Sequence, residues 1–202
     1  MVPARPDEDT ARLSSALSGL PPPQAVPFMV LICGLPGSGK SYLARCLAEK
    51  LPAVILQSDA LRKALFGKPA YTPGESGRLF QAMRHVAAEL LAKRIPVIID
   101  ATNVTERDRR CFTRIADRLG VKTIIAHTHA PTELVKERLA ERPREPLQMS
   151  EAGWEVHESM RKKFQKVKRE HFDIDTSADI GPAVERIVHE VTKPAIIANL
   201  CK

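Results

Sequence analysis

Residues 34–41 read Gly-Leu-Pro-Gly-Ser-Gly-Lys-Ser, a complete G-x-x-x-x-G-K-[ST] pattern. An apolar run at residues 28–33 precedes it, and helix-forming residues follow it from 42 to 50. Glycines let the backbone curl so that successive N–H groups converge on one anion, and the N-terminus of the following helix adds partial positive charge. The segment therefore predicts a strand, a phosphate-binding loop and a helix, the arrangement that binds a nucleoside triphosphate.

The residue types in this loop also predict a divalent metal ion. Lys40 can reach the β- and γ-phosphates of a bound triphosphate, and the Ser41 hydroxyl can coordinate Mg²⁺. The expected ligands are therefore ATP and Mg²⁺. The residues expected to contact the nucleotide are Gly34, Leu35, Pro36, Gly37, Ser38, Gly39, Lys40, Ser41 and Tyr42.

The composition sets the wider limits. A chain of 202 residues with 44% hydrophobic and 27% charged residues suits one α/β domain with a sizeable core. No apolar run approaches the ~20 residues of a membrane helix, and the first residues lack a signal-peptide pattern, so we expect a cytoplasmic protein without membrane partners. The net charge of +7 favours anionic partners, which include nucleotides and nucleic acids.

The alternation of short apolar runs with amphipathic stretches predicts a parallel sheet covered by helices on both faces. We expect strands at residues 28–33, 53–57, 96–100, 122–127 and 171–174. We expect helices near residues 40–50, 60–66, 75–94, 105–119, 131–142, 150–168 and 182–191. Thr105 and Ser150 are expected N-caps and Gly120 a helix terminator.

The chain divides into three parts. Residues 1–27 are rich in proline and poor in large apolar residues, which predicts a disordered or loosely docked extension. Residues 28–193 form the expected nucleotide-binding domain, with a lid near 138–149. Residues 194–202 form an apolar tail. Cysteines at 33, 46, 111 and 201 form no C-x-x-C pair and are expected to be reduced.

Asp59 and Arg62 follow the second expected strand. Ligands of open α/β sheets bind beyond the carboxyl ends of the strands, so Asp59 should face the terminal phosphate of the nucleotide. A carboxylate there can accept the proton of an attacking hydroxyl, and Arg62, one turn later, can hold an anionic substrate. The alternative makes Asp59 a helix N-cap and Arg62 a surface charge.

Asp100 ends the third expected strand, in the segment Val-Ile-Ile-Asp-Ala-Thr-Asn. An acidic residue in this place can orient Mg²⁺ or its waters, while Thr102 and Asn103 can hydrogen bond a substrate at the same edge. The alternative is that these residues only turn the chain into the next helix.

Arg138 and Arg142 are four residues apart and share a helix face that ends at Pro143. Mobile arginines that close over a transferring phosphoryl group can raise its rate by about 10³ or more, and a lid that carries them excludes water. We expect Arg138 to contact the nucleotide and Arg142 to act in catalysis. Surface ion pairs with Glu137, Glu141 and Glu145 are the alternative.

Four segments together resemble the small P-loop kinases of the polynucleotide 5′-hydroxyl kinase and zeta-toxin group: GLPGSGKS, SDALRKAL, VIIDATN followed by ERDRR, and TELVKERLAERP. The resemblance spans residues 30–177. It implies a P-loop three-layer α/β/α fold with a five-stranded parallel sheet in the order 2-3-1-4-5. It also implies Asp59 as the general base, Arg62 as the contact to the acceptor phosphate, and Arg142 or Arg138 as the lid arginine.

These observations predict an ATP- and Mg²⁺-dependent kinase that acts on a hydroxyl group, with a nucleic-acid 5′ end as the leading acceptor. A small metabolite or nucleotide sugar is the second candidate. A nucleotide-binding switch or ATPase module is the candidate from another class. A basic run at residues 161–169 could follow a nucleic-acid backbone, but a solvated helix face is the favoured interpretation because Phe164 is the one aromatic residue within the run.

Overall fold

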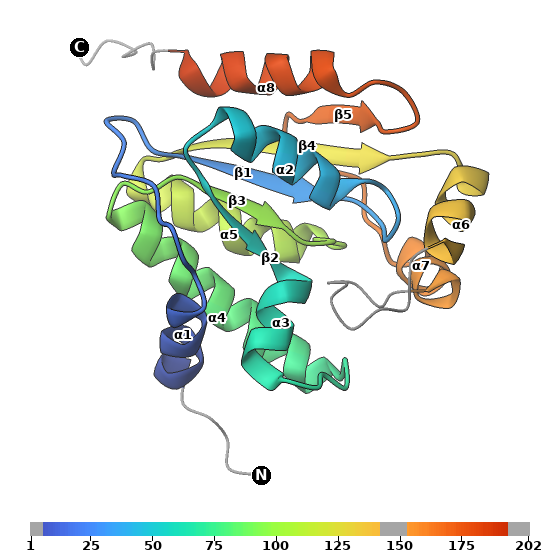
Figure 1. Cartoon of the computed structure of the whole chain (residues 1–202), viewed down its shortest axis with the longest axis horizontal. Helices are drawn as coiled ribbons and strands as arrows, with labels where there is room; N and C mark the ends of the chain where they lie inside the picture. The colour runs from blue at the N-terminus through green and yellow to red at the C-terminus, as the bar shows by residue number, and fades with distance from the viewer. Residues whose placement is uncertain (1–5, 142–152, 194–202) are drawn as a thin grey trace.

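The computed structural model describes residues 6–141 and 153–193, which build one five-stranded parallel sheet (Figure 1). Its order is β2-β3-β1-β4-β5, which confirms the expected 2-3-1-4-5 topology. The strands are β1 (Phe28–Cys33), β2 (Val54–Gln57), β3 (Val97–Asp100), β4 (Lys122–His129) and β5 (Phe172–Asp175). Because all five run parallel, their carboxyl ends meet at one edge of the sheet.

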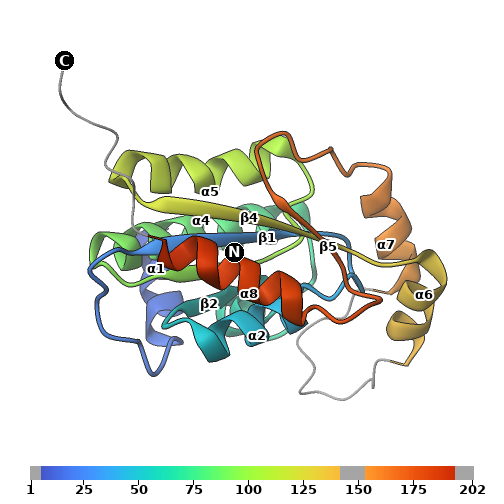
Figure 2. The same ribbon diagram turned by 90° about the horizontal axis from the view of Figure 1, so that it is seen from above.

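Helices cover both faces of the sheet and give the expected three layers (Figure 2). One face carries α2 (Lys40–Lys50) and α8 (Gly181–Thr192). The other carries α3 (Ser58–Phe66), α4 (Pro73–Ala92) and α5 (Glu106–Leu119). The two short helices α6 (Thr132–Ala140) and α7 (Trp154–Arg161) lie beyond the end of β4 (Figure 1). Within residues 6–141 and 153–193, no helix is long and apolar enough to cross a membrane.

The central strand β1 is buried along its whole length because it packs on both layers. Its side chains alternate between two cores. Met29 and Leu31 join the core under α3, α4 and α5, whereas Val30 and Ile32 join the core under α2 and α8. A strand buried on both faces has to be apolar throughout, which explains why the run before the glycine loop contains no polar residue.

Local signals fix the ends of α5. Thr105 and Asp108 form a reciprocal capping box at its start, and Gly120 ends it in the left-handed conformation with φ of 63°. Both assignments agree with the sequence expectation. The other expected N-cap, Ser150, lies outside the described residues.

The N-terminal segment differs from its expectation of disorder or loose docking. Residues 6–15 form helix α1, which packs against α4 and α3. Leu13 is fully buried in the core, and Asp9 accepts two hydrogen bonds from Arg78 at 2.9 and 2.7 Å. One apolar side chain and one bidentate ion pair hold this helix, a signal too small for the composition of residues 1–27 to reveal.

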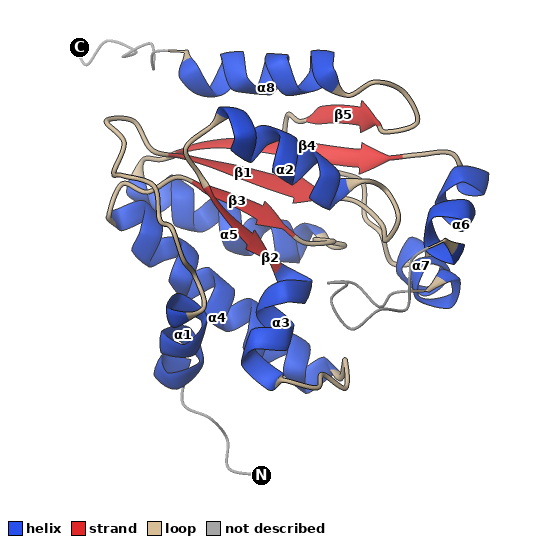
Figure 3. Ribbon diagram, viewed as in Figure 1, coloured by secondary structure: helices blue, strands red, loops and turns tan. Residues whose placement is uncertain are grey.

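The helix expected at 150–168 is also shorter than its pattern indicated, since α7 ends at Arg161 and an irregular segment continues to β5 (Figure 3). Tertiary contacts explain the difference. The Gln165 amide donates to the Val104 carbonyl at 3.0 Å, and Val167 is buried in the core beneath α5. An irregular backbone allows both contacts, and so the basic run lies along α5 instead of forming one helical face.

Candidate active site at the carboxyl edge of the sheet

The loop at residues 34–39 joins β1 to the N-terminus of α2, as the sequence predicted. Gly34 has φ of +151°, and a Cβ atom there would lie 2.6 Å from both Ser38 Oγ and Thr128 Oγ1. These two hydroxyls hydrogen bond to each other at 2.7 Å beneath the loop. Glycine is therefore required at position 34 because the loop backbone packs directly on β4.

Lys40 and Ser41 begin α2 and lie at the mouth of the loop. The Lys40 ammonium donates to the Leu35 carbonyl at 2.9 Å, which holds it over the loop backbone. The Ser41 hydroxyl accepts a hydrogen bond from Gln57 Nε2 at 3.1 Å, at the end of β2. Lysine, hydroxyl and loop amides therefore share one edge of the sheet, where a helix N-terminus favours an anion.

Asp100 ends β3 beside this pair and is almost completely buried. Burial raises the pKa of its carboxyl group, while Lys40 and hydrogen bonding from Ser41 lower it and the charge of Asp59 raises it. Among the described residues, Asp100 Oδ2 has no hydrogen-bond partner. A buried carboxylate oxygen with no protein partner is costly unless another group occupies it.

These groups fit a magnesium ion. Mg²⁺ prefers oxygen ligands and keeps several of its waters, so one carboxylate and one hydroxyl are a suitable protein contribution. A cavity of about 470 Å³ adjoins them, lined by Ser41, Gln57 and Asp100 together with parts of α2, α3 and residues 16–21. Asp100 and Ser41 therefore face a space that can hold an ion and its water.

Asp59 lies in the first turn of α3, next to the same edge. It is partly buried, and its charge acts on Asp100 together with that of Lys40. The structure thus brings Lys40, Ser41, Asp59 and Asp100 into one electrostatic cluster. The N-cap position of α3 is occupied by Gln57, so Asp59 is not the N-cap residue that the sequence allowed as an alternative.

Arg62 is buried one turn later on α3, at 7% exposure. Its Nη2 donates to Ser76 Oγ at 3.2 Å, its Nη1 lies 3.9 Å from Glu75 Oε2, and its guanidinium lies 5.0 Å from the Tyr71 ring. Within the described residues, Nε and Nη1 have no hydrogen-bond partner. Arg62 is therefore no surface charge, and it retains donors for an anion.

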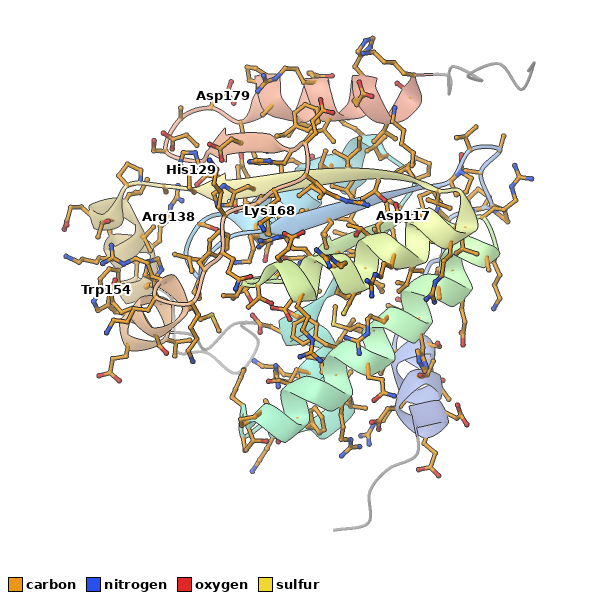
Figure 4. All side chains as sticks on the ribbon, turned by 180° about the vertical axis from the view of Figure 1, so that it is seen from behind. Asp117, His129, Arg138, Trp154, Lys168 and Asp179 are labelled. Atoms are coloured by element: carbon orange, nitrogen blue, oxygen red, sulfur yellow. The ribbon has the colours of Figure 1, made fainter. Side chains whose placement is uncertain are left out.

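Arg138 links the loop to the end of β5 (Figure 4). Its guanidinium donates to Thr176 Oγ1 at 2.8 Å, to the Thr176 carbonyl at 2.7 Å and to the Gly37 carbonyl at 3.4 Å. It lies on α6, next to the nucleotide loop. Arg142 and most of the expected lid at 138–149 lie outside the described residues.

Thr102 and Asn103 occupy less accessible places than the sequence indicated. The Thr102 carbonyl accepts a hydrogen bond from the Gly34 amide at 3.1 Å. Asn103 is 1% exposed, and its side-chain amide donates to the Ile32 carbonyl at 2.7 Å. Both residues brace the loop against β1, and the buried side chain of Asn103 does not reach the open edge.

The structure adds four polar residues that sequence reasoning missed. Gln57 contacts Ser41, Thr128 contacts Ser38, and Thr176 donates to the Ser38 carbonyl at 3.1 Å. The ring of His157 hydrogen bonds to the Pro36 carbonyl at 2.8 Å and stacks on Trp154. Gln57 and Thr176 could have been found because each lies at the carboxyl end of a strand, but His157 carried no such signal.

A family model described as an AAA domain matches residues 29–167, which is well over half of the chain. The match begins in β1 and ends beyond α7, so it includes every strand of the sheet except β5.

Two curated relatives are kinases. The chain is 28% identical over 115 residues to an adenylyl-sulfate kinase of Paraburkholderia xenovorans, a match that covers 54% of this chain and 63% of that protein. It is 24% identical over 119 residues to an L-seryl-tRNA(Sec) kinase of Methanococcus maripaludis, which covers 56% of this chain and 46% of that protein. The chain thus spans less than two thirds of the length of these relatives.

A solved structure has the same fold. The APS kinase of Mycobacterium tuberculosis, in complex with AMPPNP and APS, superposes with a TM-score of 0.61 at 19% identity. The superposition covers 83% of this chain and 98% of that one. At this identity the likeness establishes the fold and leaves the acceptor open.

Proposed function

We propose that this chain, which belongs to the AAA domain family and has the fold of P-loop kinases, transfers the γ-phosphate of ATP to a hydroxyl group of an anionic acceptor. One observation carries the proposal. Lys40, Ser41, Asp59 and Asp100 gather at one edge of the sheet, and Asp100 has a buried oxygen without a partner among the described residues.

Each of these residues has a task in phosphoryl transfer. The loop amides and Lys40 hold the β- and γ-phosphates, and their positive charge offsets the charge on the transferring oxygens. Ser41 and Asp100 would hold Mg²⁺, directly or through its waters, and the ion would supply positive charge that offsets the charge developing on the transferring phosphoryl group. Arg138, already within hydrogen-bond reach of the loop, adds a further cation at the phosphate end.

Asp59 is the proposed general base. It lies in the first turn of α3, within this cluster, and can accept the proton of the attacking hydroxyl as the oxygen–phosphorus bond forms. Arg62 lies one turn further along α3, and its Nε and Nη1, which have no hydrogen-bond partner among the described residues, suit a phosphate group of the acceptor. In the proposed site an acceptor therefore carries a hydroxyl and a nearby anion.

A polynucleotide 5′ end has both groups, and a basic surface supports this acceptor. The segment 162–169 lies along α5, held by the hydrogen bonds of Arg109 to the Gln165 and Lys166 carbonyls and by the Arg169–Asp117 ion pair (Figure 4). Exposed cations on this segment and on α5 form what we call the basic surface: Arg107, Arg110, Arg114, Arg118, Lys162, Lys163, Lys166 and Lys168.

A small anionic metabolite is the second candidate. Arg62 needs only one anionic group on the acceptor, and one of the relatives acts, by its name, on adenylyl sulfate. A switch or ATPase module is a weaker alternative, since it gives no role to the buried Arg62 donors that lack a hydrogen-bond partner in the described part of the chain.

The test is a phosphate-transfer assay with radiolabelled ATP and a panel of acceptors: 5′-hydroxyl DNA and RNA oligonucleotides, nucleosides, adenylyl sulfate and nucleotide sugars. Label on the oligonucleotides alone supports the polynucleotide acceptor. Label on a small molecule alone selects the second candidate. Release of inorganic phosphate with no labelled acceptor across the panel contradicts the kinase proposal.

Replacement of Asp59 tests the chemistry. Asp59→Asn removes the base and keeps the shape, so we expect the transfer rate to fall by about 10²-fold or more while ATP affinity changes little. Transfer is measured with the active acceptor, and ATP affinity by calorimetry. The matched control is Asp7→Asn, the same substitution at an exposed position of α1. Equal transfer rates in the two variants would remove Asp59 from the mechanism.

A further inference from the structure

Three histidines and one aspartate gather on β4, β5 and the residue before β5, on the face of the sheet opposite to α2. His127 and Asp173 are register partners, and His129 pairs with Asp175 two residues further on. His127 follows Ile125 by two residues, so it belongs to the face that α5 covers. The residues proposed for phosphoryl transfer lie in the glycine loop and on α2, α3, β3 and α6, and no residue of this cluster is among them.

The side chains of the cluster lie close enough to share one ion. One ligand atom from each of His127, His171 and Asp173 lies within 4.8 Å of the other two. His127 Nδ1 is 2.7 Å from Asp173 Oδ1, and His129 Nε2 is 3.6 Å from Asp173 Oδ2. Ligand atoms of a tetrahedral zinc ion, at about 2.0–2.1 Å from the metal, are about 3.3 Å apart, so small side-chain movements suffice.

The ring of His171 is oriented for ligation. Its Nδ1 contacts the Arg169 carbonyl at 2.8 Å, and since a carbonyl only accepts, Nδ1 carries the proton. The lone pair is then on Nε2. A ligating histidine that donates its other N–H to a backbone carbonyl is the usual arrangement in metal sites.

The ring of His127 is also held in place and suited to ligation. It stacks on Phe164, with ring centroids 5.3 Å apart and an interplanar angle of 28°. The stacking fixes the plane of the ring, and its Nδ1 lies 2.7 Å from Asp173 Oδ1.

We propose that His127, His171 and Asp173 form a binding site for a divalent transition-metal ion of the zinc class, with His129 or water as the fourth ligand. Two imidazoles and a carboxylate select such ions over Mg²⁺, which prefers oxygen ligands alone. The proposal is independent of the kinase activity. The ion would fasten the segment 162–171 to the edge of the sheet and so hold the basic surface against α5.

Zinc binding to the full-length protein tests the proposal. The protein is freed of metal with EDTA and titrated with Zn²⁺ by calorimetry without nucleotide, and Co²⁺ replaces Zn²⁺ for absorption spectra. We expect one zinc ion per chain and the visible bands of tetrahedral Co²⁺. His171→Gln and Asp173→Asn should each lower the zinc affinity by about 10-fold or more. His85→Gln, an exposed histidine on α4, is the matched control and should bind like the wild type.

Thermal unfolding provides a second readout that does not rest on affinity alone. Zinc binds only the folded site, so it should raise the unfolding temperature of the wild type and of His85→Gln by several degrees. The unfolding temperatures of His171→Gln and Asp173→Asn should change little when zinc is added. The proposal is overturned if the wild type takes up no zinc, or if both cluster variants bind zinc as tightly as His85→Gln.

Discussion

At the scale of single residues, Asp100 shows how a functional group can oppose folding. Its carboxyl group is buried, its Oδ2 has no partner among the described residues, and burial raises its pKa. A carboxylate that is more costly to ionise in the folded chain than in the unfolded chain destabilises the fold whenever it is charged. The protein retains it, which fits a residue kept for a ligand.

This argument predicts that Asp100→Asn makes the ligand-free protein more stable at pH 8, by about 1–3 kcal/mol. The sign follows from the raised pKa. Below about pH 4, the pKa of an aspartate in the unfolded chain, the carboxyl group is neutral in the folded and unfolded states and does not affect stability. As the pH rises through the folded pKa the group becomes charged, and its destabilising effect on the folded state grows. Urea unfolding at pH 4.5 and pH 8 should show a gap between variant and wild type that widens with pH. A variant that is less stable than the wild type at both pH values would contradict this prediction.

At the scale of elements, the docking of α1 explains how a proline-rich segment becomes part of the domain. The helix contributes one fully buried leucine, Leu13, and one nearly buried acid, Asp9, which holds Arg78 of α4. Residues 16–19 and 21, which follow this helix, line the cavity beside Asp100 and Ser41. Loss of α1 would therefore change the surroundings of the candidate magnesium site as well as the stability of the core.

Replacement of Leu13 tests this role. Leu13→Ala leaves a cavity in the core between α1 and α4, so we expect the free energy of unfolding to fall by about 2–5 kcal/mol. Chemical denaturation gives the value. The control is Leu20→Ala, the same change at a side chain that is 48% exposed, where we expect less than about 0.5 kcal/mol. A similar small loss in both variants would show that α1 adds little to the fold.

At the scale of the whole molecule, the net charge of +7 is unevenly distributed. The basic surface on α5 and the segment 162–169 begins near the carboxyl edge of the sheet, where α5 starts. There the backbone N–H of Glu106 donates a hydrogen bond to Gln165 Oε1 and ties the segment to the first turn of α5. A long anionic acceptor could thus reach the candidate active site and contact these cations at the same time. Such contacts raise affinity by releasing counterions and weaken with salt.

This arrangement predicts a charge effect that depends on the length of the acceptor. Lys168→Glu should raise the KM for a long 5′-hydroxyl oligonucleotide by about 3–10-fold and leave the KM for a dinucleotide unchanged. The slope of log KM against log salt concentration for the long oligonucleotide should become smaller by about one. Lys93→Glu, at the end of α4 and away from this edge, is the control with the same charge change. Equal KM values in the two variants would argue against the basic surface as a binding site.

The strands, the glycine loop and the position of Asp100 could be predicted from the sequence, because each depends on a local pattern. Periodic apolar residues specify strands and helices, and the residues at 34–41 specify the loop. The parallel order then places Lys40, Ser41, Asp59 and Asp100 at one edge. Local patterns therefore identified the proposed catalytic centre before any contact was known.

Contacts between residues that are far apart in the chain, by contrast, become visible only in the folded structure. Thr176 reaches Ser38 over 138 residues, and Asn103 turns inward to Ile32 over 71. The meeting of His171 with His127 likewise depends on how β4 and β5 pair and on the path of the segment before β5. Sequence patterns describe neighbours along the chain, whereas these contacts arise from packing, which no local pattern encodes.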